Sequence, residues 1–122
     1  MVKRPFPHRG QIWHMDPNPV FGHELKDPHY FIVITDGDLN RALKVAMCCP
    51  ISTGAEAARS QGVTVNVLPH DTHNGNLRGV VLCHQLKAVD LIARSATYYT
   101  DADEALVDEV VSKLINIIDP QI

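Results

Sequence analysis

Long apolar runs are missing from this 122-residue sequence, and so are the signatures of several common active sites. No stretch approaches the roughly 18 consecutive apolar residues of a membrane-spanning helix. The opening MVKRPFPHRG lacks the apolar core of a secretory signal, so we expect a cytoplasmic protein with no membrane partner. No GxSxG, GxxxxGK[ST], GxGxxG, HxH or HExxH pattern occurs, which argues against serine hydrolase, nucleotide-loop and zinc-protease sites.

Cysteine is also scarce, with Cys48 and Cys49 adjacent and Cys83 far along the chain. An odd number of cysteines without regular spacing argues against a disulfide scaffold, and the absence of CxxC pairs argues against a zinc ribbon. All three lie in apolar segments, where thiols pack as small hydrophobic groups rather than act as nucleophiles. We therefore expect no metal site and no cofactor.

What is present describes one globular domain spanning 1–122. The composition is 45% apolar and 20% charged, and the net charge is −3. Residues 101–122 hold six carboxylates against one lysine, so the rest of the chain carries a small excess of cations. This distribution is compatible with a local phosphate-binding patch on the body of the protein.

The hydrophobic pattern predicts short strands followed by one long helix. DGD at 36–38 is a turn signal, LNRAL at 39–43 suits one helical turn, and PHDTHNGN at 69–76 suits a hairpin connection. Apolar residues spaced at 3.6 predict a helix at 101–118, capped by Thr100 or Asp101 and stopped by Pro120. The fold class is therefore α+β and mainly β, a small bent sheet or barrel with a C-terminal helix. We expect its strands at 10–16, 30–35, 44–52 (ending near Pro50), 63–67, 78–85 and within 87–100.

Histidine is the abundant chemical group, with seven in the chain. His8, His70 and His73 fall in polar stretches and are expected at the surface. The remaining candidates lie in loops or at strand ends that could converge at one rim: His23, Glu24, His29, Ser52, Thr53 and His84. Imidazoles titrate near neutral pH and suit acid–base chemistry. RNA cleavage by internal transesterification is one such reaction, and these residues alone leave others open.

Three ordered motifs make a family resemblance specific. Three segments resemble, at matching spacings, motifs of the MazF/PemK (Kid, ChpB) toxins. The first, RGQIWHMDPNPVFGHE (9–24), resembles RG-[DE]-I-W…DP…G-x-E, and the second, PISTGAEAARSQG (50–62), resembles P-[VI]-T-S-GG-N-x-AR-x-x-G. The third, GVVLCHQLKAVDLIAR (79–94), resembles GVV-x-x-[DN]-Q-x-[KR]-x-[ID]-D-x-x-AR. The likeness covers nearly the whole chain and is closest to the PemK branch.

This resemblance implies an SH3-like barrel of five to seven strands with a C-terminal helix. It implies a toxin of a type II toxin–antitoxin system that cleaves single-stranded RNA without a metal, leaving a 2′,3′-cyclic phosphate and a 5′-hydroxyl, and so inhibits translation and growth. It also implies a homodimer, for which we expect exposed apolar residues near Phe21 and Tyr30 and an interface using the terminal-helix side and the 54–62 region. The implied partner is an antitoxin with a disordered acidic tail.

Site residues carry over one position at a time. Gly22, His23 and Glu24 match the G-x-E of the loop that covers the active site. Ser52 matches a phosphate-binding threonine, and Arg59 matches the arginine of the AR-x-x-G segment. Gln85 and Arg94 match the Q…D…AR segment, and Asp90 matches its aspartate. We assign catalysis to His23, Glu24, His29, Ser52 and His84, and RNA binding to Gly22, Lys26, Thr53, Arg59, Gln85 and Arg94.

Two departures from the family pattern set the alternatives. His29 stands where the family usually carries a catalytic arginine, and Leu82 and His84 replace an arginine and an aspartate. Either paired imidazoles now do the acid–base work, or the site is degenerate and binds RNA or antitoxin without cutting. A third alternative is a CcdB-like toxin, which has the same barrel but poisons gyrase through its terminal helix and performs no chemistry.

Overall fold

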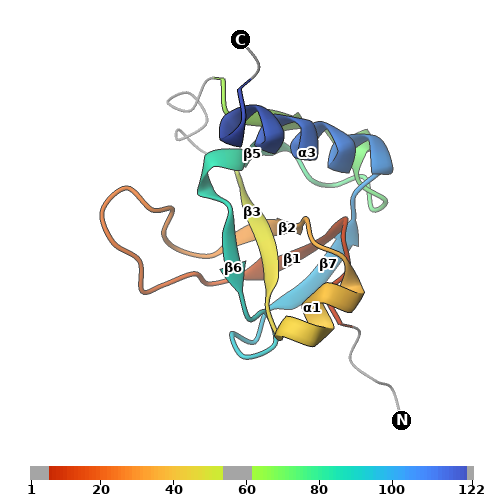
Figure 1. The fold of residues 1–122 in the computed structure, drawn as a ribbon. Coiled ribbons are helices and arrows are strands. Elements are labelled where there is room, and N and C mark those ends of the chain that lie inside the picture. Colours follow the sequence, from red (N-terminus) through yellow and green to blue (C-terminus); the bar gives the residue numbers. More distant parts are fainter. Residues whose placement is uncertain (1–5, 54–61, 121–122) are drawn as a thin grey trace.

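The computed structural model describes residues 6–53 and 62–120, in which seven antiparallel strands form one bent sheet (Figure 1). The sheet order is β4-β5-β3-β2-β1-β7, and β6 pairs with the remaining edge of β3. The strands are β1 (Gln11–Met15), β2 (His29–Val33), β3 (Ala46–Ser52), β4 (Thr64–Val67), β5 (Gly79–Leu82), β6 (Lys87–Val89) and β7 (Thr97–Asp101). The helical elements are α1 (Gly37–Leu43), η1 (Pro69–Asp71), η2 (Cys83–Gln85) and α3 (Glu104–Ile118).

The sheet closes into a barrel because the connection after β4 meets the end of β7. Thr72 forms an isolated antiparallel bridge with Ala102. The His73 backbone N–H donates to the Asp101 carbonyl at 2.9 Å, and the Asp103 N–H donates to the Asp71 carbonyl at 2.8 Å. These bonds satisfy backbone groups that an open sheet would expose. The predicted small barrel with a terminal helix is confirmed.

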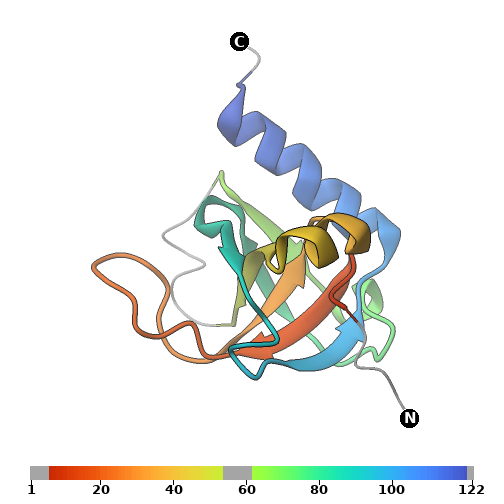
Figure 2. The same cartoon turned by 60° about the horizontal axis from the view of Figure 1, so that its bottom comes forward.

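Helix α3 covers one face of the sheet (Figures 1 and 2). Its buried side chains, Leu106, Val107, Val110 and Leu114, pack against inward residues of β1 to β5. Each such burial contributes about 1.5–3 kcal/mol, so this contact is the main anchor of the helix. The helix begins three residues later than the sequence predicted, with Asp103 as N-cap, because Thr100 and Asp101 belong to β7.

The opposite face of the sheet carries a second core. It consists of Trp13, Met15, Phe31, Val33, Ala46, Cys48, Val89 and Leu91. Side chains alternate along a strand, so Pro50 and Ser52 point to the same face as Ala46 and Cys48. His29 lies opposite Met15 and two residues before Phe31, which places it on this face as well. The face away from α3 therefore collects several of the predicted site residues.

Strand β3 ends at Ser52, the last residue of the predicted range 44–52, but the expectation that Pro50 would end it is wrong. Ile34 N–H bonds to the Met47 carbonyl, and this pattern directs the Pro50 nitrogen away from β2. On that other edge, the pairing of β3 with β6 ends at Cys48 and its pairing with β5 begins at Ile51, so Pro50 lies in the gap between the two. A proline nitrogen is tolerated there because no partner strand needs an N–H donor.

The predicted strand at 78–85 was too long, because the chain leaves the sheet after Leu82 and turns through η2. β5 and β6 both pair with the same edge of β3. From the pair Ile51–Val81 to the pair Ala46–Val89, β3 advances by five residues, whereas the segment that contains β5 and β6 advances by eight. The three additional residues are accommodated in a bulge at 83–85. His84 and Gln85 thus project from a bulge, not from a regular strand.

The predicted turn at 36–38 is the start of α1. Asp36 is its N-cap residue, and the helix runs for seven residues instead of one turn. The Asn40 side chain donates to the carbonyls of Pro7 and Thr35, which ties the helix to the N-terminal segment.

Candidate active site

The long loop at 16–28 is held against the body of the protein at two places. Gln85 spans the first, where its Nε2 donates to the His23 carbonyl at 3.1 Å and its Oε1 accepts from the Leu25 N–H at 3.3 Å. At the base of the loop, Arg94 Nη1 donates to the Asp16 and Asn18 carbonyls, each at 3.4 Å. Gln85 and Arg94, predicted to bind RNA, are therefore positioned to fix the loop that carries His23 and Glu24.

The loop also has its own internal bonds. Asn18 and Asp27 exchange two hydrogen bonds across its neck, at 3.2 and 3.3 Å. At the tip, Glu24 Oε2 accepts the Phe21 N–H at 2.8 Å, while the Glu24 N–H donates to the Phe21 carbonyl. Gly22 lies inside this turn at φ +58°, a conformation that favours glycine. In both views the loop, drawn in orange, projects from the side of the sheet, clear of α3 (Figures 1 and 2).

A pocket of about 140 Å³ lies where the loop meets the bulge at 83–85. Glu24 and His84 line it together, with Gln85 beside them. Phe31 and Pro50 form part of its wall, and Lys87 adds a cation. The structure thus brings one predicted imidazole and one predicted carboxylate to the same cavity, on the face of the sheet away from α3.

Ser52 and Thr53 line a second cavity, of about 200 Å³, between β3, β4 and β5. Its cation is Arg78, which the sequence analysis missed. Gly79 makes this site compact, since a Cβ there would lie 2.6 Å from the Ser52 carbonyl oxygen. Ser52 is only 1% exposed, so Thr53 and Arg78, both exposed, are the lining groups that suit an anionic oxygen such as that of a phosphate.

The two cavities adjoin through β3, because Pro50 lines the first and Ser52, two residues on, lines the second. His29 lines neither, but it shares their face of the sheet and precedes Phe31. Its Nε2 lies 3.1 Å from the Lys26 carbonyl. A carbonyl only accepts, so Nε2 carries the hydrogen and Nδ1 is directed elsewhere.

Other predicted residues are placed less closely. His23 and Lys26 are exposed on the loop, and each contributes its backbone carbonyl to the contacts above. Arg59 lies outside the described residues. Lys87 and Arg78 were missed because their positions depend on strand register. Lys87 lies within the third quoted motif, at 79–94, and Arg78 directly precedes that motif.

The histidines expected at the surface, His8, His70 and His73, are exposed. All three cysteines are free and buried, and burial raises the pKa of the Cys48 thiol to about 12. A thiol with that pKa is protonated at neutral pH and is a poor nucleophile. Within residues 6–53 and 62–120, no three His, Cys, Asp or Glu side chains gather in a way that could hold a metal ion. In that same part of the chain no helix has the length and hydropathy required to cross a membrane.

Comparison with known proteins places this arrangement in context. Curated relatives include Endoribonuclease PemK of Escherichia coli, 28% identical over 90% of this chain and 80% of the relative. Endoribonuclease toxin ChpB of Escherichia coli strain K12 is 29% identical over 98% of this chain and 100% of the relative.

Solved structures share the fold. MazF from Deinococcus radiodurans superposes with a TM-score of 0.80 at 22% identity, covering 93% of this chain and 96% of that one. A mycobacterial endoribonuclease in complex with its cognate antitoxin gives 0.72 at 15% identity, covering 95% and 98%. The profile of one family, described as the PemK-like, MazF-like toxin of type II toxin–antitoxin systems, matches residues 8–118. The chain belongs to this family.

Proposed function

We propose that this protein is the toxin of a type II toxin–antitoxin pair and an endoribonuclease that cleaves single-stranded RNA without a metal. The carrying observation is the placement of His84 and Glu24 in one cavity, beside a second cavity that offers Ser52, Thr53 and Arg78. The names of the PemK and ChpB relatives support the same activity. The cytoplasm is the proposed location, since that is where messenger RNA is accessible.

The reaction requires two proton transfers and an anion-binding site. A base removes the proton from the 2′-hydroxyl, and the 2′-oxygen attacks the adjacent phosphorus. The P–O5′ bond then breaks, and an acid gives a proton to the 5′-oxygen. The products are a 2′,3′-cyclic phosphate and a 5′-hydroxyl, so no water and no redox partner enters this step.

His84 is the proposed base. Gln85 must donate to the His23 carbonyl and accept from Leu25, so its Nε2 is the donor that faces His84 Nε2 at 3.5 Å. At 3.5 Å this contact is long, so the Nε2 lone pair of a neutral His84 ring remains available to take the proton of the 2′-hydroxyl. His29, whose Nε2–H is held by a carbonyl, is the proposed acid, because that contact is retained when the ring is a cation.

The anion site would stabilise the charge that develops on phosphorus. The exposed Thr53 hydroxyl and Arg78 guanidinium supply donors to the non-bridging oxygens, while Ser52, also in the lining, is only 1% exposed. Arg78 and Lys87 thereby supply positive charge in place of the arginines that this chain lacks at positions 29 and 82. Their presence favours an active site over a degenerate one.

Cleavage of a labelled RNA in EDTA tests the proposal. Products ending in a cyclic phosphate, with a bell-shaped pH–rate profile near neutrality, are expected if two imidazoles exchange protons. The variant His29→Arg should lose the alkaline limb of the pH–rate profile, which reports deprotonation of the acid, because arginine stays protonated throughout this range. RNA binding without cleavage would instead support the degenerate toxin, and growth arrest with intact RNA would support a gyrase poison.

A further inference from the structure

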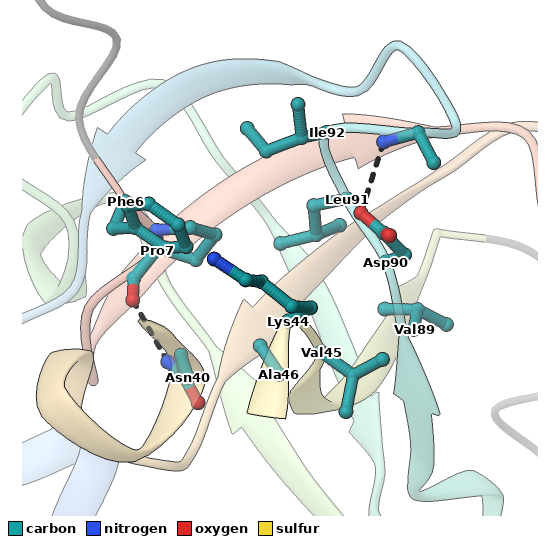
Figure 3. A pocket seen from close by; sticks show the side chains of 11 residues that line it. Phe6, Pro7, Asn40, Lys44, Val45, Ala46, Val89, Asp90, Leu91 and Ile92 are labelled. Carbon is teal, nitrogen blue, oxygen red and sulfur yellow. Dashed lines mark hydrogen bonds between the residues drawn. The ribbon is translucent and has the colours of Figure 1, made fainter. Parts of the chain in front are cut away.

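A cavity of about 340 Å³ opens at the other end of the second core, away from the candidate active site (Figure 3). It lies between the N-terminal segment, the end of α1 and the turn that follows β6. Ala46 borders it, whereas Pro50, four residues along β3, borders the cavity of His84. Cys48 is buried between them, so the two cavities are separate.

The lining is almost entirely apolar. Asn40 is the one amide in it, and both of its N–H donors are already used. Its Nδ2 donates to the Pro7 carbonyl at 2.8 Å and to the Thr35 carbonyl at 2.9 Å, and its Oδ1 accepts from the Thr35 hydroxyl. The hydrophobic walls come chiefly from Phe6, Val45, Ala46, Val89, Leu91 and Ile92.

Lys44 is the exception, because it brings a positive charge to this apolar cavity. Its ammonium lies 5.6 Å from the centroid of the Phe6 ring. Among the described residues it forms no ion pair and no side-chain hydrogen bond. Asp90 also borders the cavity, but its Oδ1 accepts the Ala93 N–H at 2.9 Å. Figure 3 shows the ammonium pointing toward Phe6 and Pro7, on the side away from Asp90.

We propose that this cavity binds a small apolar monocarboxylate, with its carboxylate on Lys44 and its hydrocarbon against the buried wall. The volume is at the small end of the ~300–1,000 Å³ of ligand sites, which suits a medium-chain or compact aromatic acid. Lys44 is the cation that lines the cavity and matches one negative charge; the Arg41 guanidinium also lies 5.4 Å from the Phe6 centroid but is not part of the lining. The Asp90 carboxylate disfavours a dianion such as a phosphate ester. Neither a neutral alcohol nor an amine would use Lys44.

Titration calorimetry of the whole chain with octanoate tests this inference, with 1-octanol and octylamine as matched probes. Octanoate should bind with one site per chain, and the two neutral or cationic probes should bind at least tenfold more weakly. Lys44→Met keeps the unbranched stem and removes the charge, so it should weaken octanoate at least tenfold. Lys113→Met, on α3, is the matched control and should bind octanoate like the unaltered protein.

Methyl NMR locates the bound probe. Octanoate should shift the methyl signals of Val45, Val89, Leu91 and Ile92, and leave those of Ile115 and Ile118 on α3 unchanged. Three results would overturn the inference: no binding at about 10 mM octanoate, well above a ~1 mM Kd; equal binding to the Lys44→Met protein; or shifts confined to α3. Retained RNA cleavage in Lys44→Met would separate this site from the active one.

Discussion

At the scale of single residues, the exchange of an aspartate for His84 is the departure on which the proposed chemistry depends. Its place in a bulge, rather than in a strand, puts it in the lining of one cavity with Glu24 and Gln85. An imidazole there replaces a group that cannot exchange protons efficiently at neutral pH.

His84→Ala should lower the rate of RNA cleavage ~10²–10⁴-fold, the usual contribution of one acid–base group. Binding of a non-cleavable 2′-O-methyl RNA should change little, because the anion site is intact. His70→Ala removes an exposed imidazole far from the loop and serves as the control. If the two alanine variants cleaved equally well, His84 would have no role in proton transfer.

Arg78→Gln should weaken binding of the same non-cleavable RNA. The loss of a charged hydrogen bond costs ~1.5–3 kcal/mol, which is tenfold or more in affinity. The slope of log affinity against log salt should also fall by about 0.7, the value for one phosphate contact on a single strand. Arg9→Gln, also exposed, is the matched control. An unchanged salt slope in the Arg78 variant would place that guanidinium off the RNA.

At the scale of elements, Gln85 is the link between the bulge and the loop. One amide satisfies a backbone carbonyl and a backbone N–H of a segment about sixty residues away. Arg94 holds only the base of the loop, so the position of the tip depends on Gln85. The position of Glu24 in the cavity of the candidate active site follows from it.

Gln85→Ala should release the loop tip without unfolding the barrel. Hydrogen–deuterium exchange of peptides covering 20–27 should accelerate, and that of peptides from β1 and β3 should not. Gln85→Glu retains the acceptor for Leu25 and loses the donor to His23, so it should give an intermediate rate. Unchanged exchange in the alanine variant would show that Asn18, Asp27 and Arg94 hold the loop without help.

At the scale of the whole molecule, buried thiols link stability to alkaline pH. The pKa of Cys48 is raised by burial to about 12, whereas an unfolded thiol titrates near ~8.5. The unfolded chain therefore releases this proton first. The contribution of Cys48 to the free energy of unfolding is complete below the pKa of the unfolded thiol, and it is lost as pH rises toward the pKa of the folded one.

Urea unfolding across this interval should show the effect. The free energy of unfolding should fall with a slope up to ~1.4 kcal/mol per pH unit from this thiol, and Cys48→Ala should reduce the slope. Tyrosines and lysines titrate in both proteins, so the difference between the slopes isolates the thiol. Parallel slopes would mean that Cys48 ionises equally well in the folded state.

A homodimer is the expected assembly, and α3 offers a surface for it. Ile115 and Ile118 are exposed on its outer side, with 57% and 74% of their surface accessible. Phe21 is exposed as expected, but Tyr30 is half-buried between His14 and Tyr99 and is a weak candidate. Light scattering should give twice the chain mass, and Ile115→Glu with Ile118→Glu should give the monomer. Leu43→Glu, on α1, is the control.

The sequence was informative where each segment's pattern agrees with its structure. The alternation of Val63, Val65 and Val67 predicted β4, and the periodic apolar stripe predicted α3. It failed where distant pairing decides the outcome. The bulge at 83–85 depends on the register of two strands against β3, and no local pattern of residues encodes it.

The same limit applies to the candidate site. Its histidines could be selected from loop positions and motif matches, because those features are local. Arg78 and Lys87 became candidates only when the register placed them beside Ser52 and Pro50. The anchoring roles of Gln85 and Arg94 could not be foreseen either, since they join segments separated by sixty to eighty residues.

The bulge at 83–85 restricts how this protein can change in length. Because it contains an odd number of extra residues, it reverses the parity of the chain: Val81 points toward α3, whereas Val89 and Lys87 point to the opposite face. A one-residue insertion or deletion here would turn Val89 out of the second core onto the exposed face that carries Ala88, and would remove Lys87 from the cavity of His84. Length variation among natural relatives should therefore avoid this segment.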